Sequence, residues 1–286
     1  MDIFINGIGS ISAQAFNPRS QEDLFDDSKL HPMVCVEPQY ATLIPPMQLR
    51  RMSKVVRMGI ATAKQALNDC ELEKPDIITL GTAYGCLADT ENFLGKLLQQ
   101  DESMLSPTAF IQSTHNTVSG QIALLLNCHG HNFTFVHRGY SFESSLQDAM
   151  MWIAESNQEE INILCGGIDE LTKDSLAIIS RFGTFKKEHE HFYTKTEGTL
   201  AGEGANLFVL SNKQTTHSYA KLKDFCMCNQ GEAEQELSRF LLRNQLHSND
   251  IDTCLIGLNG DKRYDEDILN NIASLQQAQW INFKQW

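Results

Sequence analysis

The chain has 286 residues, of which 42% are hydrophobic, so it can form one large core or two smaller ones. Its formal net charge of −13 disfavours nucleic acid and anionic membrane surfaces as partners, because no concentrated basic patch offsets the negative field. The one basic cluster, formed by Arg50, Arg51, Lys54 and Arg57, is typical of the solvated face of a helix. The composition therefore predicts an ordinary globular protein.

The eight cysteines lack the paired spacing of a secreted disulfide framework. The N-terminus has no basic segment followed by a long apolar core, and no apolar run has the length of a membrane span. We therefore expect a soluble cytoplasmic protein. Cys226 with Cys228, and His189 with His191, each offer two metal ligands but lack a second pair at the spacing of zinc sites. We expect neither a metal nor a cofactor.

Predicted helices alternate with short apolar strands, which favours an α/β fold. A helix is expected over residues 47–69, where apolar residues recur every three or four positions after Pro46. A buried strand follows at 77–80 and stops at Gly81. The further expected elements are a helix at 120–127, a strand at 132–136, a helix at 141–155 and strands at 161–165, 205–210 and 219–225.

The pattern of the first helix and strand recurs near the C-terminus. A helix over 232–246 is followed by Asp250-Ile251-Asp252 and by an apolar run that ends at Gly257. This repetition predicts two related halves, the first at residues 1–213 and an incomplete second at residues 214–286.

Residues 135–146 have the pattern of a nucleophile turn. An apolar strand leads through a glycine turn into a helix, an arrangement that enzymes use to expose a reactive side chain at the positively polarised start of a helix. In this chain the exposed position is occupied by Gly139, which has no side chain to react.

Four segments occur in the order that one protein family shows. They are a helix at 48–54, the segment 110–123 with Thr114-His115-Asn116-Thr117, Cys165-Gly166-Gly167-Ile168-Asp169-Glu170, and Gly198-Thr199-Leu200-Ala201-Gly202-Glu203-Gly204-Ala205. Together they resemble the β-ketoacyl synthase family over roughly residues 1 to 266, in particular a divergent branch from aryl-polyene and flexirubin-type pigment clusters.

The resemblance implies a thiolase-like α/β fold of two related halves, layered α-β-α-β-α, with the C-terminal half truncated. It also makes loop glycines candidates for lining the substrate pocket, namely Gly166, Gly167, Gly202 and Gly204. Family enzymes carry out decarboxylative Claisen condensation on an acyl chain held by an acyl carrier protein. That reaction needs a cysteine thiolate at a helix N-terminus, where backbone amides lower its pKa and form an oxyanion hole. It also needs two histidines, or a histidine and an asparagine, to polarise the thioester carbonyl.

None of these catalytic groups is intact in this chain. The resemblance places the family's cysteine at Gly139 and its first histidine in the loop 257–262, where Asn259 offers only an amide. The second histidine and the catalytic lysine belong to a region beyond Trp286, and residues 276–286 match nothing in the family.

Three interpretations remain open. The first is a non-condensing subunit analogous to a chain-length factor, which pairs with a cysteine-bearing ketosynthase or a second copy through the strand at 132–136 and works with an acyl carrier protein. In it Phe110, Ile111, Gln112 and Thr114 help line the interface or the acyl tunnel. The second is an active acyltransferase with Ser141 or Cys165 as nucleophile and His115 or His137 as base. The third is a degenerate remnant that binds a protein partner.

Overall fold

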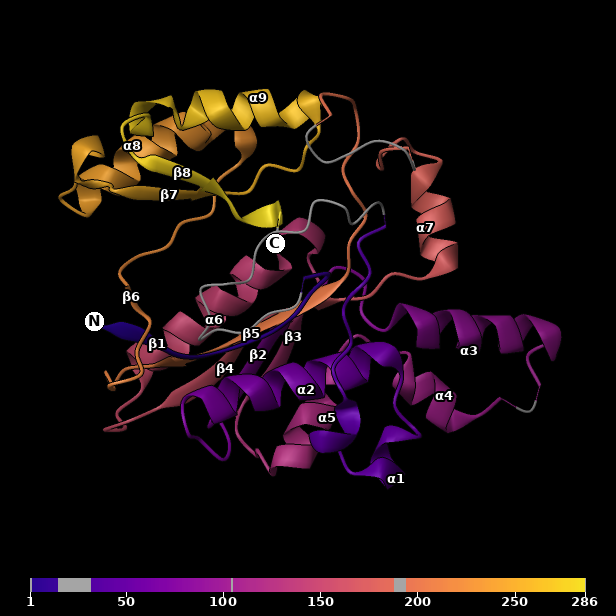
Figure 1. Cartoon of the computed structure of the whole chain (residues 1–286). Coiled ribbons are helices and arrows are strands. Elements are labelled where there is room, and N and C mark those ends of the chain that lie inside the picture. The colour runs from indigo at the N-terminus through magenta and orange to yellow at the C-terminus, as the bar shows by residue number, and fades with distance from the viewer. Residues whose placement is uncertain (1, 15–31, 104, 188–193, 286) are drawn as a thin grey trace. The chain divides into compact units, whose positions relative to one another are not determined.

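A six-stranded sheet forms the centre of the first of two units in the part of the chain that the structure describes (Figure 1). The structure is a computed structural model that describes residues 2–14, 32–103, 105–187 and 194–285. His189 and His191, which sequence analysis considered as metal ligands, lie outside the described residues.

Each unit collects segments that are distant in sequence. The first contains the N-terminal strand, Val34–Ser175 and Glu203–Lys223, and the second contains the described residues of Leu176–Gly202 and Asp224–Trp286. The two sequence-related halves that we expect at 1–213 and 214–286 stay a prediction. The two compact units are defined by packing in space, so they do not test whether the sequence contains an internal repeat.

The sheet unit alternates strands and helices along much of its length. Its elements are β1 (Ile3–Ile11), α1 (Pro46–Leu49), α2 (Lys54–Asp69), β2 (Ile77–Gly81), α3 (Leu87–Gln99), α4 (Pro107–Gln112), α5 (Thr117–Leu126), β3 (Asn132–Phe135), α6 (Ser141–Glu155), β4 (Asn162–Asp169), β5 (Gly204–Ser211) and β6 (Ala220–Leu222). The order across the sheet is β3-β2-β4-β5-β1-β6. β2 pairs in parallel with β3 and β4, whereas β5 runs antiparallel to β4 and β1. The predicted α/β class is confirmed.

Helices cover both faces of this sheet. α2 and α5 lie on one face and α6 on the other (Figure 1). Side chains of a strand alternate between the two faces, so Leu164 of β4 packs on the side of α2, while Ile163 and Cys165 pack on the side of α6. The central strands are buried on both faces, which explains their continuous apolar sequences.

The second unit contains a smaller sheet. α7 (Lys173–Ser180) leads into it from the first unit, and its further elements are α8 (Ala233–Arg243), β7 (Thr253–Ile256), α9 (Lys262–Asn271) and β8 (Gln279–Asn282). β7 and β8 pair in parallel, with Thr253 opposite Gln279. Residues 276–286, which sequence analysis left unassigned, thus supply one of its two described strands.

Several expected elements differ from the structure, and the strand expected over 219–225 is reduced to β6 at Ala220–Leu222. The helix expected over 47–69 is two helices, α1 and α2, separated by non-helical residues up to Ser53. No glycine or proline marks this break, and Leu49 before it and Met52 within it pack against the core. The strand expected to end at Cys165 continues to Asp169. Its two glycines are part of the strand, because sheet pairing on both sides holds them extended.

Two glycines of β1 allow α2 to lie directly against the sheet. A Cβ added at Gly9 would lie 2.1 Å from the carbonyl oxygen of Thr62, and one at Gly7 would lie 2.2 Å from that of Ala66. Both distances are far shorter than van der Waals contact, so a side chain at either position displaces the helix.

Buried carboxylates hold the segment between β2 and α3. Asp169 accepts hydrogen bonds from the Thr82 hydroxyl at 2.9 Å and from the Ala83 amide at 2.9 Å. Glu170, which is 4% exposed, accepts one from the Ala88 amide at 3.0 Å, in the first turn of α3. Burial raises the pKa of Glu170 to about 7. The start of α3 is thus fixed by acids at the end of β4.

Gly9→Ala should destabilise the protein by about 1–3 kcal/mol, because the added methyl group overlaps the backbone of α2. Gly95→Ala in α3 is the matched control, since an added Cβ there meets nothing within 4 Å and alanine favours the helix by about 0.5–1 kcal/mol. Urea unfolding followed by circular dichroism measures both changes. Unchanged stability of Gly9→Ala would contradict the close packing.

Glu170→Gln should stabilise the protein only at higher pH. The folded pKa of about 7 lies above the reference value of 4.5, so the folded state binds the proton more tightly. The stabilising contribution of this protonated Glu170 side chain is complete below pH 4.5 and is lost as the pH rises through about 7. We expect the variant to exceed the wild type by about 1–3 kcal/mol at pH 8 and to match it near pH 5. Glu73→Gln, at an exposed position, should show no such pH dependence.

Candidate functional site

The turn between β3 and α6 is the region where sequence analysis expects a missing nucleophile. The chain leaves β3 at Phe135 and makes one turn of 3-10 helix at Arg138–Tyr140 before α6 begins at Ser141. Gly139 lies in the middle of this turn. A Cβ added there would meet nothing within 4 Å, so the position has room for a side chain that the sequence does not provide.

The Ser141 hydroxyl stabilises this turn through two hydrogen bonds to the backbone. It donates to the carbonyl of Arg138 at 2.9 Å and accepts from the amide of His137 at 2.8 Å. The residue is 4% exposed. Arg138 has a φ of 50°, a left-handed conformation that non-glycine residues seldom adopt, and the Ser141 bonds span it. The Ser141 hydroxyl, which was considered as an alternative nucleophile, is therefore already hydrogen-bonded to backbone atoms of the turn.

The start of α6 lies on the sheet over glycines of β2 and β4. A Cβ added at Gly81 would be 2.4 Å from the Ser141 carbonyl carbon, and one at Gly167 would be 3.7 Å from the Phe142 Cβ. At Gly166 an added Cβ would be 2.1 Å from the Asn206 carbonyl oxygen. Gly166 and Gly167 lie within β4 and not in a loop, because both pair with the neighbouring strands β2 and β5. Their role in lining a substrate pocket stays a prediction.

The two candidate bases lie on different segments. His137 is in the turn, with its ring 5.8 Å from that of Tyr140. His115 lies between α4 and α5, where it lines a void of about 10 Å³ together with Gly81, Gly85 and Thr134. Such a void holds about one water molecule at most. The Ser141 hydroxyl bonds to backbone atoms and to neither imidazole.

Cys165 lies beneath α6 in the core. It is 0% exposed, and its sulfur is 3.5 Å from the Ser145 hydroxyl. Burial raises the pKa of this thiol to about 12. Because the thiolate is the reactive form, Cys165 is poorly suited to attack an acyl thioester.

The loop before β5 is anchored by its glutamate. Gly202 and Gly204, which sequence analysis considered as pocket glycines, flank Glu203. The Glu203 carboxylate is paired with Lys54 and accepts hydrogen bonds from the Cys35 amide at 3.0 Å and the Leu171 amide at 3.1 Å. Sequence analysis missed this role, although a charged residue between two glycines of a buried segment is a usable signal.

The loop after β7 lies in the second unit. The side-chain oxygen of Asn259 accepts a hydrogen bond from the Lys284 ammonium at 2.6 Å, and the backbone amide of Asn259 donates to the Asp265 carboxylate at 2.9 Å. The side-chain amide of Asn259, which could have replaced a catalytic histidine, is thus hydrogen-bonded to Lys284. The described residues contain no group of three His, Cys, Asp or Glu side chains that could hold a metal ion. No described helix is long and apolar enough to cross a membrane.

The turn and α6 can polarise a bound carbonyl but cannot form an acyl-enzyme at Gly139. The amides at the start of a helix carry partial positive charge, and no side chain caps α6 in the structure. Stabilisation of an oxyanion is thus available at this helix end, while Gly139 itself provides no nucleophile.

Solved structures with this fold include a β-ketoacyl synthase from Burkholderia phymatum STM815, which is 17% identical with a TM-score of 0.77. The ishigamide ketosynthase/chain length factor is 18% identical with a TM-score of 0.74. Each match covers 99% of this chain and 80% of the other. A type II PKS ketosynthase in complex with its acyl-carrier protein is 15% identical with a TM-score of 0.72, over 99% and 85% of the two chains. No curated protein sequence matches the chain.

These structures have the thiolase-like fold, and their likeness extends over nearly the whole chain. The model of the β-ketoacyl synthase N-terminal domain matches residues 26–171, a range that contains β2 to β4 and the turn at Gly139. This range is just over half of the 286 residues, and the chain belongs to the β-ketoacyl synthase family.

Proposed function

We propose that this chain is a non-condensing subunit of a fatty-acid or polyketide (polyene) synthase, similar in role to a chain length factor. The observation that carries the proposal is Gly139 in the turn before α6, the position at which the resemblance to the family places the catalytic thiol. The open space at Gly139 and the intact hydrogen bonds of the turn indicate that the scaffold is retained without its nucleophile. A ketosynthase/chain length factor is among the similar structures.

The geometry of the turn argues against the alternative of an active enzyme with another nucleophile. The Ser141 hydroxyl is bonded to two backbone groups, and Cys165 is buried with a raised pKa. Neither group is placed like a thiol that projects from position 139. We therefore assign condensation to a separate cysteine-bearing ketosynthase and not to this chain, whichever chain pairs with it at an interface.

The free edge of β3 is the surface through which we propose that the partner binds. β3 is at one edge of the six-stranded sheet of the described residues, and its backbone pairs only with β2. Phe133 is 50% exposed, and Leu124 of α5 is exposed near this edge. An edge strand with exposed apolar neighbours is suited to pairing with another chain.

An acyl carrier protein is the proposed source of the acyl chain, since one of the similar structures is a ketosynthase in complex with its acyl-carrier protein. A cytoplasmic location is part of the same proposal, and the eight free cysteines are compatible with a reducing compartment. The partner is a cysteine-bearing ketosynthase or a second copy of this chain.

Incubation of the wild type with radiolabelled acyl carrier protein should leave the chain unlabelled, because no thiol stands at the start of α6. Gly139→Cys should fold normally and be alkylated by iodoacetamide at the introduced thiol at least about tenfold faster than at buried Cys165. Peptide mass spectrometry measures both rates. A stable acyl label on the wild type that Ser141→Ala or Cys165→Ala removes would show that the chain is an active enzyme.

Phe133→Asp should abolish association with a ketosynthase encoded next to this chain, or self-association where the partner is a second copy. The reason is that a carboxylate in the middle of the proposed interface cannot be desolvated without a partner charge. Leu242→Asp is the matched control, because Leu242 is 78% exposed on α8 in the second unit. Analytical ultracentrifugation separates the outcomes, and equal association of both variants would exclude the β3 edge.

A further inference from the structure

The helices α3 and α4 contact each other but bury none of their side chains. Neither helix contains a buried residue. The rings of Phe93 and Phe110 lie 5.5 Å apart, and the Thr90 hydroxyl donates to the carbonyl of Ser113, at the end of α4, at 3.2 Å. Most helices in proteins are stabilised by packing of an apolar face. Because α3 and α4 bury no such face, the pair depends on polar contacts to stay in place.

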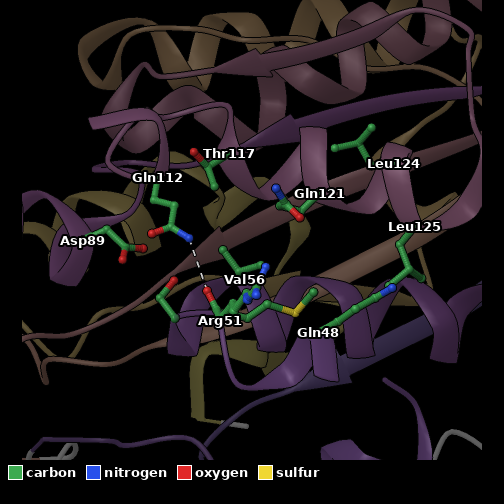
Figure 2. A pocket seen from close by; sticks show the side chains of 11 residues that line it. Gln48, Arg51, Val56, Asp89, Gln112, Thr117, Gln121, Leu124 and Leu125 are labelled. Carbon is green, nitrogen blue, oxygen red and sulfur yellow. Dashed lines mark hydrogen bonds between the residues drawn. The ribbon is translucent and has the colours of Figure 1, made fainter. Parts of the chain in front are cut away.

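A pocket of about 310 Å³ lies beside this pair of helices. Asp89 of α3 and Gln112 of α4 line it together with residues of α1, α2 and α5 (Figure 2). The Gln112 side-chain amide donates to the Arg51 carbonyl at 3.2 Å, which Figure 2 shows as a dashed line. The boundary between the pair and the helices α1, α2 and α5 is thus partly open and not filled by packed side chains.

The segment that follows β4 holds the start of α3. Glu170 accepts a hydrogen bond from the Ala88 amide at 3.0 Å. Further along α3, Glu91 accepts one from the Thr172 hydroxyl. These two bonds tie the first turns of α3 to residues 170–172, and both of them use a carboxylate as the acceptor.

Glu170 is poorly compensated when it is ionised. It is 4% exposed, and burial raises its pKa to about 7. The charged groups that face it are Asp89 of α3, Glu203 before β5 and Lys54 of α2. Lys54 is paired with Glu203, so the charge of this lysine is shared between two acids. The nearby Cys86 thiol stays neutral, because burial raises its pKa to about 12.

Asp89 adds a second poorly compensated carboxylate at the same place. Its Oδ2 is shut off from solvent and makes no hydrogen bond within the described residues. Ionised Glu170 and Asp89 therefore repel each other, and movement of α3 away from residue 170 returns both to water. The closed form binds the Glu170 proton more tightly than an open form, in which the pKa has its ordinary value of 4.5. Closure is thus favoured at low pH, and this advantage is lost as the pH rises through about 7.

We propose that α3 and α4 form a pH-sensitive flap, which is held against the end of β4 while Glu170 carries a proton and opens more often once Glu170 is ionised. Opening widens the pocket beside Asp89, because α3 and α4 supply part of its wall. In the part of the chain that the structure describes, the apolar core between the sheet, α2 and α5 includes no side chain of α3 or α4. This core therefore stays packed when the flap opens.

Hydrogen–deuterium exchange of the purified full chain tests the flap. Peptides from α3 and α2 are followed by mass spectrometry, with each rate divided by that of an unstructured peptide at the same pH. Amides of α3 should exchange at least about tenfold faster than those of α2 and depend less on added urea, because local opening exposes less surface than global unfolding. Equal rates with equal urea dependence would overturn the flap. Exchange of α3 at the rate of an unstructured peptide would also overturn it, since the helix would then not be held.

Comparison of pH 6 with pH 8 tests the role of Glu170. The normalised exchange of α3 in the wild type should rise at least about fivefold, as a pKa that falls from about 7 to 4.5 on opening predicts. Glu170→Gln keeps an oxygen acceptor for the Ala88 amide and gains no charge, so its exchange should change less than about twofold. Glu73→Gln, at an exposed position after α2, should behave like the wild type. Circular dichroism checks that both variants are folded. No rise in the wild type, or an equal rise in folded Glu170→Gln, would exclude Glu170 as the controlling group.

Discussion

The contact between the start of α6 and the central strands is the constraint on which the site depends. Gly81 of β2 stands beside Gly167 of β4, and the missing side chain of Gly81 lets the first residues of α6 rest on the sheet. The helix therefore begins at a fixed point beyond the parallel strands. Any residue placed one turn earlier, as Gly139 is, is presented at the positively polarised end of that helix.

This constraint is independent of the chemistry that the family performs. The glycines of β2 and β4, the hydrogen bonds of Ser141 and the left-handed Arg138 all shape the backbone, and none of them needs a thiol at position 139. The reactive group can thus be lost without loss of the fold.

The elements with strong local signals were predictable from the sequence. α6 and the strand β2 follow from apolar periodicity and terminal residues, and both lie within a residue or two of the expected bounds. The break between α1 and α2 was not predictable, because residues 50–53 contain no glycine or proline that would interrupt a helix. β1 was missed because its glycines, which weaken a strand signal, are required by contact with α2.

The candidate site divides in the same way. The position of Gly139 follows from a sequence pattern, since a strand, a glycine turn and a helix are contiguous in the chain. The pocket beside Asp89 is assembled from α1, the break after it, α2, α3, α4 and α5, and no local sequence pattern joins these segments. In sequence, Asp89 is an ordinary acidic residue in the first turn of α3, where its negative charge interacts favourably with the helix dipole. Only the three-dimensional structure shows that one of its oxygens is buried without a donor among the described residues, which no motif in this part of the chain predicts.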